Sequence, residues 1–400
     1  MRYLSVPARE DRPIDVAIFG ATGFTGRLVV EYFKKAYGSN GSLKWAMAGR
    51  SLEKLEKVAS ELGVSGEVPV LVADTADSAS MEKLVQNSKV VLTTVGPYQI
   101  YGNELVGACA ANGTDYVDLC GEPNWMYDMI KIHQDAAKKS GSRIVFSCGF
   151  DSIPFDLGVY FLQQQARVTL GGAMPRVRGR VRRMKGTWSG GTLASLRATL
   201  SAVKTDKNVL DVMRSPFSLT PGFTGPDQPR GNKPYFDEAV DSWVAPFVMA
   251  SINTKNVHRS NFLLKQQYGK EFVYDEMIMT GQGEKGEARA QAVANSTAMN
   301  DDKTPPGEGP SREDRESGYY DILLVGEGAA DKKISVSVVG DMDPGYGSTS
   351  KMISESAVCL ALNQNMASGG IWTPAAAMGA ELIPRLEANA GLKFTLEESE

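Results

Sequence analysis

The chain has 400 residues, a formal net charge of −4 and 42% hydrophobic residues. This length allows two domains with a sizeable core, and the small net charge gives no sign of a nucleic-acid partner. No apolar run is long enough to span a bilayer, and residues 1–13 lack the apolar segment of a secretory signal. We therefore expect a globular protein that works in the cytoplasm.

Cysteine and histidine are scarce in this chain. The four cysteines show no C-x-x-C spacing, and there are only two histidines. This pattern predicts neither disulfides nor a zinc site, and it argues against a His-rich metal centre or a catalytic triad built on histidine. We expect no metal, and a reducing compartment as the environment of the chain.

The most informative stretch runs from Val16 to Gly26. Four apolar residues at 16–19 predict a buried strand, and a helical pattern begins at Phe24. The glycines between them recur every three residues, so the backbone can turn tightly and admit a pyrophosphate at the helix N-terminus. The G-x-x-G-x-x-G spacing alone is moderately specific, but its context favours a dinucleotide site over an ordinary Gly-rich turn. The predicted contacts are Gly20, Ala21, Thr22, Gly23, Phe24, Thr25 and Gly26.

The end of the second predicted strand, at 45–48, indicates which nicotinamide cofactor is bound. NAD sites carry an acidic side chain here, which hydrogen-bonds the ribose hydroxyls. This sequence has Arg50 and Ser51 instead. A guanidinium and a hydroxyl suit a 2′-phosphate, which a carboxylate would repel. The sequence therefore favours NADP(H) over NAD(H), with a surface role for Arg50 as the alternative.

The third predicted strand, at 70–73, is followed by Asp74. At the open end of a parallel sheet this carboxylate is placed either to contact the adenine or to cap the helix predicted at 78–86. The residues do not decide between these two interpretations.

The fourth predicted strand, at 90–94, leads into Val95, Gly96, Pro97 and Tyr98. In doubly wound sheets this strand end lies beside the nicotinamide. We expect the first three residues to lie against the cofactor, because Gly and Pro form a rigid turn there. Tyr98 either donates a hydrogen bond into the cleft or is simply packed.

Further strands at 116–119 and 143–147 alternate with helices at 103–112 and 124–139. This alternation predicts an α/β fold with a Rossmann doubly wound parallel sheet, covered on both faces. The expected division is an N-terminal tail at 1–13, a dinucleotide-binding domain at 14–165, an α+β substrate domain at 166–345 and C-terminal helices at 346–400 that pack back on the first domain.

Several other motifs follow the Gly-rich turn in a characteristic order. They are AGRS at 48–51, TVGPY at 94–98, LCGE at 119–122, GFDSIP at 149–154, WSGGT at 188–192, NTKNVHRSN at 253–261 and TPAAAMG at 373–379. Together they resemble the saccharopine dehydrogenase-like oxidoreductases, and more closely the trans-acting enoyl reductase branch of that family. The resemblance covers nearly the whole chain from Asp15 to Leu386.

The resemblance implies that NADP(H) supplies a hydride to a conjugated carbon–carbon double bond in a lipid or polyketide-derived acyl substrate, either free or held on a carrier protein. It also leaves peripheral contact with membranes or lipid droplets and a homodimer open. A saccharopine-type amino acid dehydrogenase is one alternative. A lipid-associated protein that keeps the nucleotide fold without turnover is another.

The proton donor is not evident from any single residue. The hypotheses are Tyr98, Asp151, Ser152, Tyr346 and Lys351. Tyr98 follows the fourth predicted strand, and Asp151 and Ser152 follow the sixth. The alternative role of Asp151 is to fix the loop after that strand. The last two belong to a turn, at 341–351, that leads into a helix expected to return to the first domain and so to reach the cleft.

The second half contains an alternating run of arginines at 176–182. As a strand, it places Arg176, Arg178, Arg180 and Arg182 on one face. The two interpretations are a solvated sheet face and a docking surface for an acidic partner such as a carrier protein.

The remaining patterns predict supporting structure. Residues 216–234 are rich in Pro and Gly and indicate an irregular loop over the cleft, and the polar stretch 281–318 indicates a flexible excursion. Segments 319–325 and 334–339 are expected to pair as antiparallel strands. His258 and Arg259 are expected to make structural rather than catalytic contacts.

Overall fold

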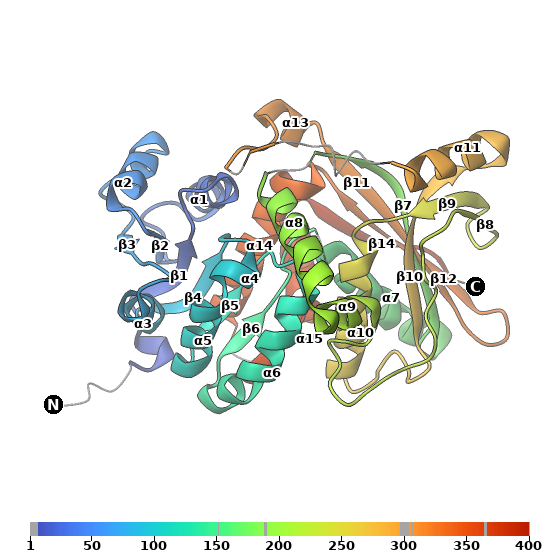
Figure 1. The fold of residues 1–400 in the computed structure, drawn as a ribbon, viewed down its shortest axis with the longest axis horizontal. Helices are drawn as coiled ribbons and strands as arrows, with labels where there is room; N and C mark the ends of the chain where they lie inside the picture. Colours follow the sequence, from blue (N-terminus) through green and yellow to red (C-terminus); the bar gives the residue numbers. More distant parts are fainter. Residues whose placement is uncertain are drawn as a thin grey trace.

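Two seven-stranded sheets lie side by side in the computed structural model (Figure 1). The structure describes residues 7–150, 152–187, 190–296, 304–305, 307–363 and 366–399. No helix in these ranges is both long and apolar enough to cross a membrane.

The first sheet is entirely parallel, in the order β13-β6-β5-β4-β1-β2-β3. This is the predicted doubly wound order, with one strand added from the end of the chain. That strand, β13, pairs with β6 at the edge and was not expected from the sequence. The bounds are β1 Ile14–Phe19, β2 Trp45–Gly49, β3 Val70–Val72, β4 Ser88–Thr93, β5 Asp115–Val117, β6 Arg143–Val145 and β13 Gly370–Trp372.

Helices cover both faces of this sheet, as the alternation of strands and helices predicts. On one face, buried side chains of α1 (Phe24–Tyr37), α2 (Leu52–Glu61) and α14 (Thr349–Leu362) share a core with the sheet. The other core contains side chains of α3 (Ser78–Gln86), α5 (Asn103–Asn112) and α6 (Pro123–Ser140). The predicted return of a C-terminal helix to the first sheet is therefore confirmed by α14.

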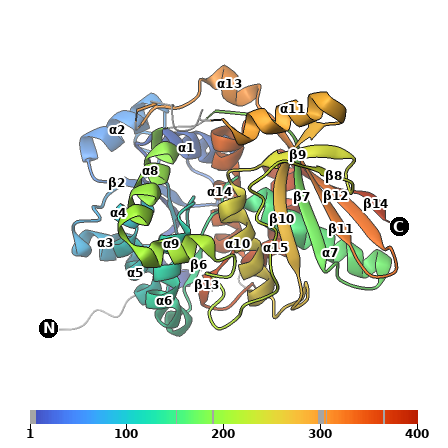
Figure 2. The ribbon, with the colours of Figure 1, turned by 45° about the vertical axis from the view of Figure 1, so that its right-hand side comes forward.

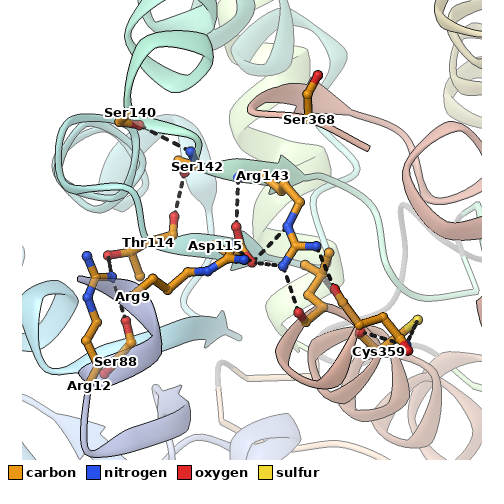
Figure 3. A network of polar contacts seen from close by, with 12 residues as sticks. Arg9, Arg12, Ser88, Thr114, Asp115, Ser140, Ser142, Arg143, Cys359 and Ser368 are labelled. Carbon is orange, nitrogen blue, oxygen red and sulfur yellow. Dashed lines mark hydrogen bonds and ion pairs between the residues drawn. The ribbon is translucent and has the colours of Figure 1, made fainter. Parts of the chain in front are cut away.

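A network of polar contacts fastens α14 to the first sheet (Figure 3). The buried carboxylate of Asp115 accepts hydrogen bonds from Arg9 and Arg143. The Arg143 guanidinium also donates to the carbonyl oxygens of Leu360 and Asn363, at 2.7 and 2.9 Å, at the end of α14. The last turn of this helix is thus satisfied by a buried cation, which suits the negative end of the helix dipole.

The second sheet is mixed, in the order β14-β12-β11-β7-β10-β9-β8. Only β7 and β10 run parallel to each other, and the predicted antiparallel pair appears as β11 and β12. The strand that closes the chain, β14, was not expected. The bounds are β7 Arg176–Lys185, β8 Tyr235–Asp237, β9 Ser242–Pro246, β10 Val273–Gly281, β11 Tyr319–Glu327, β12 Lys333–Gly340 and β14 Leu392–Ser399.

Helices from the middle and the end of the chain connect the two sheets. Gly158 of α7 packs so closely on β11 and β12 that an added Cβ would lie 2.8 Å from Leu324. Figure 1 shows α8 and α9, in green, between the two sheets, and in Figure 2 α8 lies in front of the first sheet. The bounds are α4 Tyr98–Tyr101, α7 Ile153–Leu170, α8 Gly190–Thr205, α9 Lys207–Arg214, α10 Ala250–Leu263, α11 Gly283–Ala294, α13 Arg312–Glu316 and α15 Pro374–Asn389.

Two connecting segments differ from the sequence interpretation. The stretch 281–318 is not a simple irregular excursion, because it contains α11 and α13. The stretch 216–234 has no helix or strand, as expected, but Phe217, Leu219 and Thr220 in it are buried. This loop therefore packs against the rest of the protein and does not cover the cleft.

The arginines of β7 share a face, as predicted, but they do not form a surface for a partner. Arg180 is fully buried, and its guanidinium pairs with Asp237 and Asp275 at 2.7 and 3.0 Å. Arg180 therefore belongs neither to a solvated sheet face nor to a docking surface, which were the two interpretations of this arginine run. The neighbouring arginines are also neutralised within the chain, in the pairs Arg176 with Asp275, Arg178 with Glu327, and Arg182 with Asp321 and Glu397.

We predict that Arg180→Ala lowers the free energy of unfolding by about 3–5 kcal/mol, because it removes the fully buried guanidinium that pairs with both Asp237 and Asp275. Arg183→Ala is the matched control, since that side chain is 70% exposed on the same strand and its loss is expected to change stability by no more than about 0.5 kcal/mol. Urea titrations of both variants measure the difference. Equal losses in the two variants would show that burial of the pair is energetically unimportant.

Candidate functional site

Two glycines of the turn between β1 and α1, Gly20 and Gly26, have no room for a side chain. A Cβ on Gly26 would lie 2.0 Å from the carbonyl oxygen of Gly20, so only glycine lets the helix approach the strand. Gly20 has φ of +90°, and a Cβ there would lie 2.7 Å from Val95. The first turn of α1 is thereby pressed against the ends of β1 and β4.

The geometry of this turn fits a dinucleotide. The N–H groups of Gly20 and Ala21 donate to the Ala48 carbonyl oxygen at 3.0 and 3.3 Å. Gly23 is the N-cap residue of α1, and no side chain caps the helix. The first-turn N–H groups and the positive end of the helix dipole are therefore positioned for a diphosphate, with no Cβ at Gly23 to block it.

The residues predicted to contact the adenosine lie at the ends of β2 and β3. Arg50 is exposed directly after β2, and among the described residues no hydrogen bond or ion pair involves its side chain. The Ser51 hydroxyl accepts from the Lys54 N–H at 3.3 Å and caps α2. Asp74 accepts from the Ala76 N–H at 3.0 Å and so stabilises its own turn, while Asp77 caps α3.

The strand end predicted to face the nicotinamide lies beside the Gly-rich turn. Val95 closes against Gly20, and Gly96 lines the adjoining cavity. Pro97 is the N-cap residue of α4. The Tyr98 hydroxyl donates to the Thr93 carbonyl oxygen at 3.3 Å and accepts from the Leu119 N–H at 3.0 Å. Burial raises the Tyr98 pKa well above its ordinary value, so this side chain fixes two strand ends and is a poor acid.

A cavity of about 360 Å³ opens between the sheets, next to these strand ends. Apolar side chains dominate its wall, and none of its described lining residues is charged. The polar side chains among its lining residues all carry a hydroxyl group; they are Thr25, Thr94, Tyr98, Thr187, Thr192, Ser195, Thr199, Ser251, Tyr346 and Thr349. Its larger apolar side chains are Leu119, Phe150, Met184, Leu196, Met213, Phe247, Val248, Met249 and Ile252.

Tyr346 is the sequence-predicted donor that the structure brings into this cavity. Its hydroxyl lies 2.9 Å from the Thr192 hydroxyl of α8, and the centres of the Tyr346 and Phe24 rings lie 5.3 Å apart in an edge-to-face arrangement. The Tyr346 N–H donates to the Asp343 carboxylate at 2.9 Å. Burial raises the pKa of Asp343, against the opposing effect of the Gly347 and Tyr346 N–H groups. Asp343 thus holds the turn that aims the tyrosine.

Two further proposed donors, Ser152 and Lys351, do not line the cavity. Ser152 is buried at the start of α7, where its hydroxyl accepts from the Asn256 amide. Lys351 faces Asp341 at 3.5 Å and does not line the cavity. Asp151 lies outside the described residues. The return helix was predicted correctly, but its first turn points Lys351 away from the cleft.

Several buried polar residues support the site and were not identified from the sequence. The Glu122 carboxylate accepts from the N–H groups of Tyr98 and Gln99, both at 2.9 Å, and so anchors α4. Asp118 accepts from the Cys120 and Ser147 N–H groups, and burial raises its pKa to about 7. The signal available in the sequence was a carboxylate that directly follows a strand. That signal does not tell whether the carboxylate holds the backbone in place or binds a ligand.

His258 and Arg259 are structural, as predicted. The His258 ring packs against Phe217, with centroids 4.7 Å apart, and the buried Arg259 guanidinium donates to the carbonyl oxygens of Leu219 and Ile371. Neither residue lines the cavity.

The matching family model is the saccharopine dehydrogenase NADP-binding domain, which covers residues 16–145. Two mycobacterial relatives are similar over 94% of this chain and 96% of their own length. A Mycobacterium tuberculosis protein, provisionally named a trans-acting enoyl reductase, is 37% identical. The trans-acting enoyl reductase of Mycobacterium ulcerans is 33% identical.

The fold is also that of a solved enzyme. Saccharopine dehydrogenase from Saccharomyces cerevisiae aligns with a TM-score of 0.54 over 96% of this chain and 99% of that one, at 11% identity. The predicted fold class and the preference for NADP(H) are thereby confirmed. The chain belongs to the saccharopine dehydrogenase-like oxidoreductases, in the branch of the trans-acting enoyl reductases.

Proposed function

We propose that this protein reduces a conjugated carbon–carbon double bond in an acyl substrate, using NADPH. The observation that carries the proposal is the absence of charge from the described lining of the cavity beside the cofactor turn. Saccharopine-type substrates bear several carboxylates, and their sites need converging cations. An apolar wall with scattered hydroxyl groups suits a fatty or polyketide-derived chain.

The residues of the Gly-rich turn would hold the cofactor diphosphate, and Arg50 would hold its 2′-phosphate. When bound, the cofactor would supply a hydride for the β-carbon of the enoyl group. The electron pair of the double bond then moves toward the carbonyl, and the α-carbon takes up a proton to complete the reduction.

Tyr346 and Thr192 are the residues that we assign to the substrate carbonyl. Their hydroxyls lie 2.9 Å apart at the cavity wall. Hydrogen bonds from such a pair would stabilise the negative charge that develops on the carbonyl oxygen, since the apolar wall strengthens electrostatic interactions. Tyr346 is also placed to deliver the proton, directly or through a water.

The name of the branch indicates a substrate held by another protein, and we include a carrier-bound chain in the proposal. Its docking surface is not the arginine face of β7, because those side chains are paired within the chain. We also include three further proposals: a peripheral contact with lipid, a homodimer, and domain boundaries at residues 165 and 345.

The direct test supplies NADPH together with an α,β-unsaturated acyl thioester, and in a parallel reaction saccharopine with NADP⁺. We expect NADPH to be consumed only with the enoyl thioester, with one saturated product formed for each NADPH oxidised. Turnover of saccharopine alone would establish the amino acid dehydrogenase instead. NADPH binding without turnover of any acyl thioester would favour the non-enzymatic alternative.

We predict that Tyr346→Phe lowers kcat about 10²-fold or more, because the variant loses a hydroxyl that acts on the developing charge. The NADPH dissociation constant should be unchanged, since the ring contact with Phe24 is kept. Tyr127→Phe is the control, because Tyr127 is exposed on α6. A Tyr346→Phe enzyme with the kcat of the parent would remove this residue from the mechanism.

We predict that Arg50→Ala weakens NADPH binding about tenfold or more and leaves NADH binding unchanged, because only NADPH carries the 2′-phosphate. Titration of cofactor fluorescence measures both constants. Lys54→Ala, an exposed cation on the neighbouring helix, serves as the control. Parallel loss of both affinities, or no loss, would show that Arg50 does not select the cofactor.

A further inference from the structure

A segment of the second half of the chain crosses the Gly-rich turn from above. We call residues 307–317 the crossing segment; both views place its helix, α13, at the top of the molecule, above α1 (Figure 1, Figure 2). Gly309 lies so close to Phe24 that an added Cβ would be 2.5 Å from the ring. The contact is therefore with the turn that we expect to bind the diphosphate.

The crossing segment is fastened at both of its ends. The Gly190 N–H, at the start of α8, donates to the Glu308 carbonyl oxygen at 3.3 Å. The Asp343 N–H donates to the Arg315 carbonyl oxygen at 2.9 Å. Because Asp343 also holds Tyr346 and α8 carries Thr192, the segment is tied to both hydroxyls at the cavity wall.

Arg315 is the cation that this segment brings to the turn. Its guanidinium carbon lies 5.7 Å from the centre of the Phe24 ring, and its Nη1 donates to the Pro310 carbonyl oxygen at 2.7 Å. Within the described ranges the Arg315 guanidinium forms no ion pair, whereas Arg312 on the same helix pairs with Glu31 and Glu316. Burial raises the pKa of the nearby Asp343 carboxyl, and the Arg315 charge is among the smaller effects that lower it. The two Asp343 oxygens already accept the Tyr346 and Gly347 N–H groups.

The Gly-rich turn offers N–H groups but no cation of its own. A bound diphosphate carries two negative charges, and the dipole of α1 supplies only about half a positive charge. A guanidinium is the side chain best matched to phosphate oxygens, because its planar donors bind two of them at once. The aromatic face of Phe24 positions that guanidinium beside the turn without neutralising it.

We propose that Arg315 binds the diphosphate of the cofactor, so that the crossing segment forms the second wall of the cofactor site. This assigns the two arginines different tasks. Arg50 recognises the 2′-phosphate, which distinguishes NADPH from NADH, whereas Arg315 recognises the diphosphate that both cofactors share. The proposal rests on the nicotinamide cofactor and is independent of the acyl substrate.

The test measures dissociation constants for NADPH and NADH without any substrate, in Arg315→Ala, Arg315→Lys and the control Arg312→Ala. Arg315→Ala should raise both constants by the same factor, about tenfold or more. Arg315→Lys should restore part of the affinity, because it keeps the charge but loses the planar donors. Arg312→Ala should stay within about twofold of the parent, since its side chain is exposed and paired elsewhere.

Two fragments separate a diphosphate contact from a general loss of structure. ADP carries the diphosphate, and adenosine 2′-monophosphate carries only the ribose phosphate. Arg315→Ala should weaken ADP binding and leave binding of the second fragment unchanged, with a thermal midpoint equal to that of the parent. Unchanged constants for NADPH and NADH, or equal losses for the two fragments, would overturn the proposal.

Discussion

The close approach of α1 to the end of β1 is the contact on which the rest of the site depends. The carbonyl oxygen of Gly20 occupies the space that a side chain at position 26 would need. This packing aims the first turn of the helix at the end of β4 and leaves its N–H groups without a capping side chain. It also fixes the position of Phe24, whose ring contacts the Tyr346 ring and the Arg315 guanidinium. One backbone contact therefore sets the position of the turn that we propose for the diphosphate, of the Tyr346 hydroxyl and of the Arg315 guanidinium.

The second sheet keeps charge out of the cavity by pairing it elsewhere. The arginines of β7 and the acids of neighbouring strands satisfy one another, and Arg180 does so in full burial. The described wall that faces the cofactor turn is left with apolar side chains and hydroxyl groups. The fold is shared with saccharopine dehydrogenase, but the described lining of this cavity carries no charge, which suits the proposed substrate without carboxylates.

The parts of the fold that were predictable are those whose signal is local. The strand, turn and helix around Gly20 and the helices of the first sheet follow from hydrophobic period and glycine spacing alone. β13 was missed because three residues, Gly370–Trp372, become a strand only through pairing with β6. The arginine face was misread because its partners Asp237 and Asp275 lie 57 and 95 residues away from Arg180. An alternating charge pattern is the same whether water or a buried carboxylate faces it.

The sequence predicted that the turn at 341–351 lies near the cleft, but it did not predict which side chains of that turn face the cleft. Tyr346 lies in a π-helical turn held by Asp343, while Lys351 falls on the other side of the following helix. A shift of a few residues in helix phase decides which of them reaches the cavity, and no local pattern reports that phase. Ser152 shows the same limit, since its partner Asn256 comes from a distant helix.

The proposed reaction transfers the cofactor hydride to an enoyl β-carbon inside a cavity whose described lining carries no charge. Single-turnover reduction with NADPH deuterated at the transferable position, followed by mass spectrometry of the product, measures this most directly. We expect one deuterium at the β-carbon and one solvent-derived proton at the α-carbon. Deuterium on a carbon that bears oxygen or nitrogen, or none in any acyl product, would contradict it.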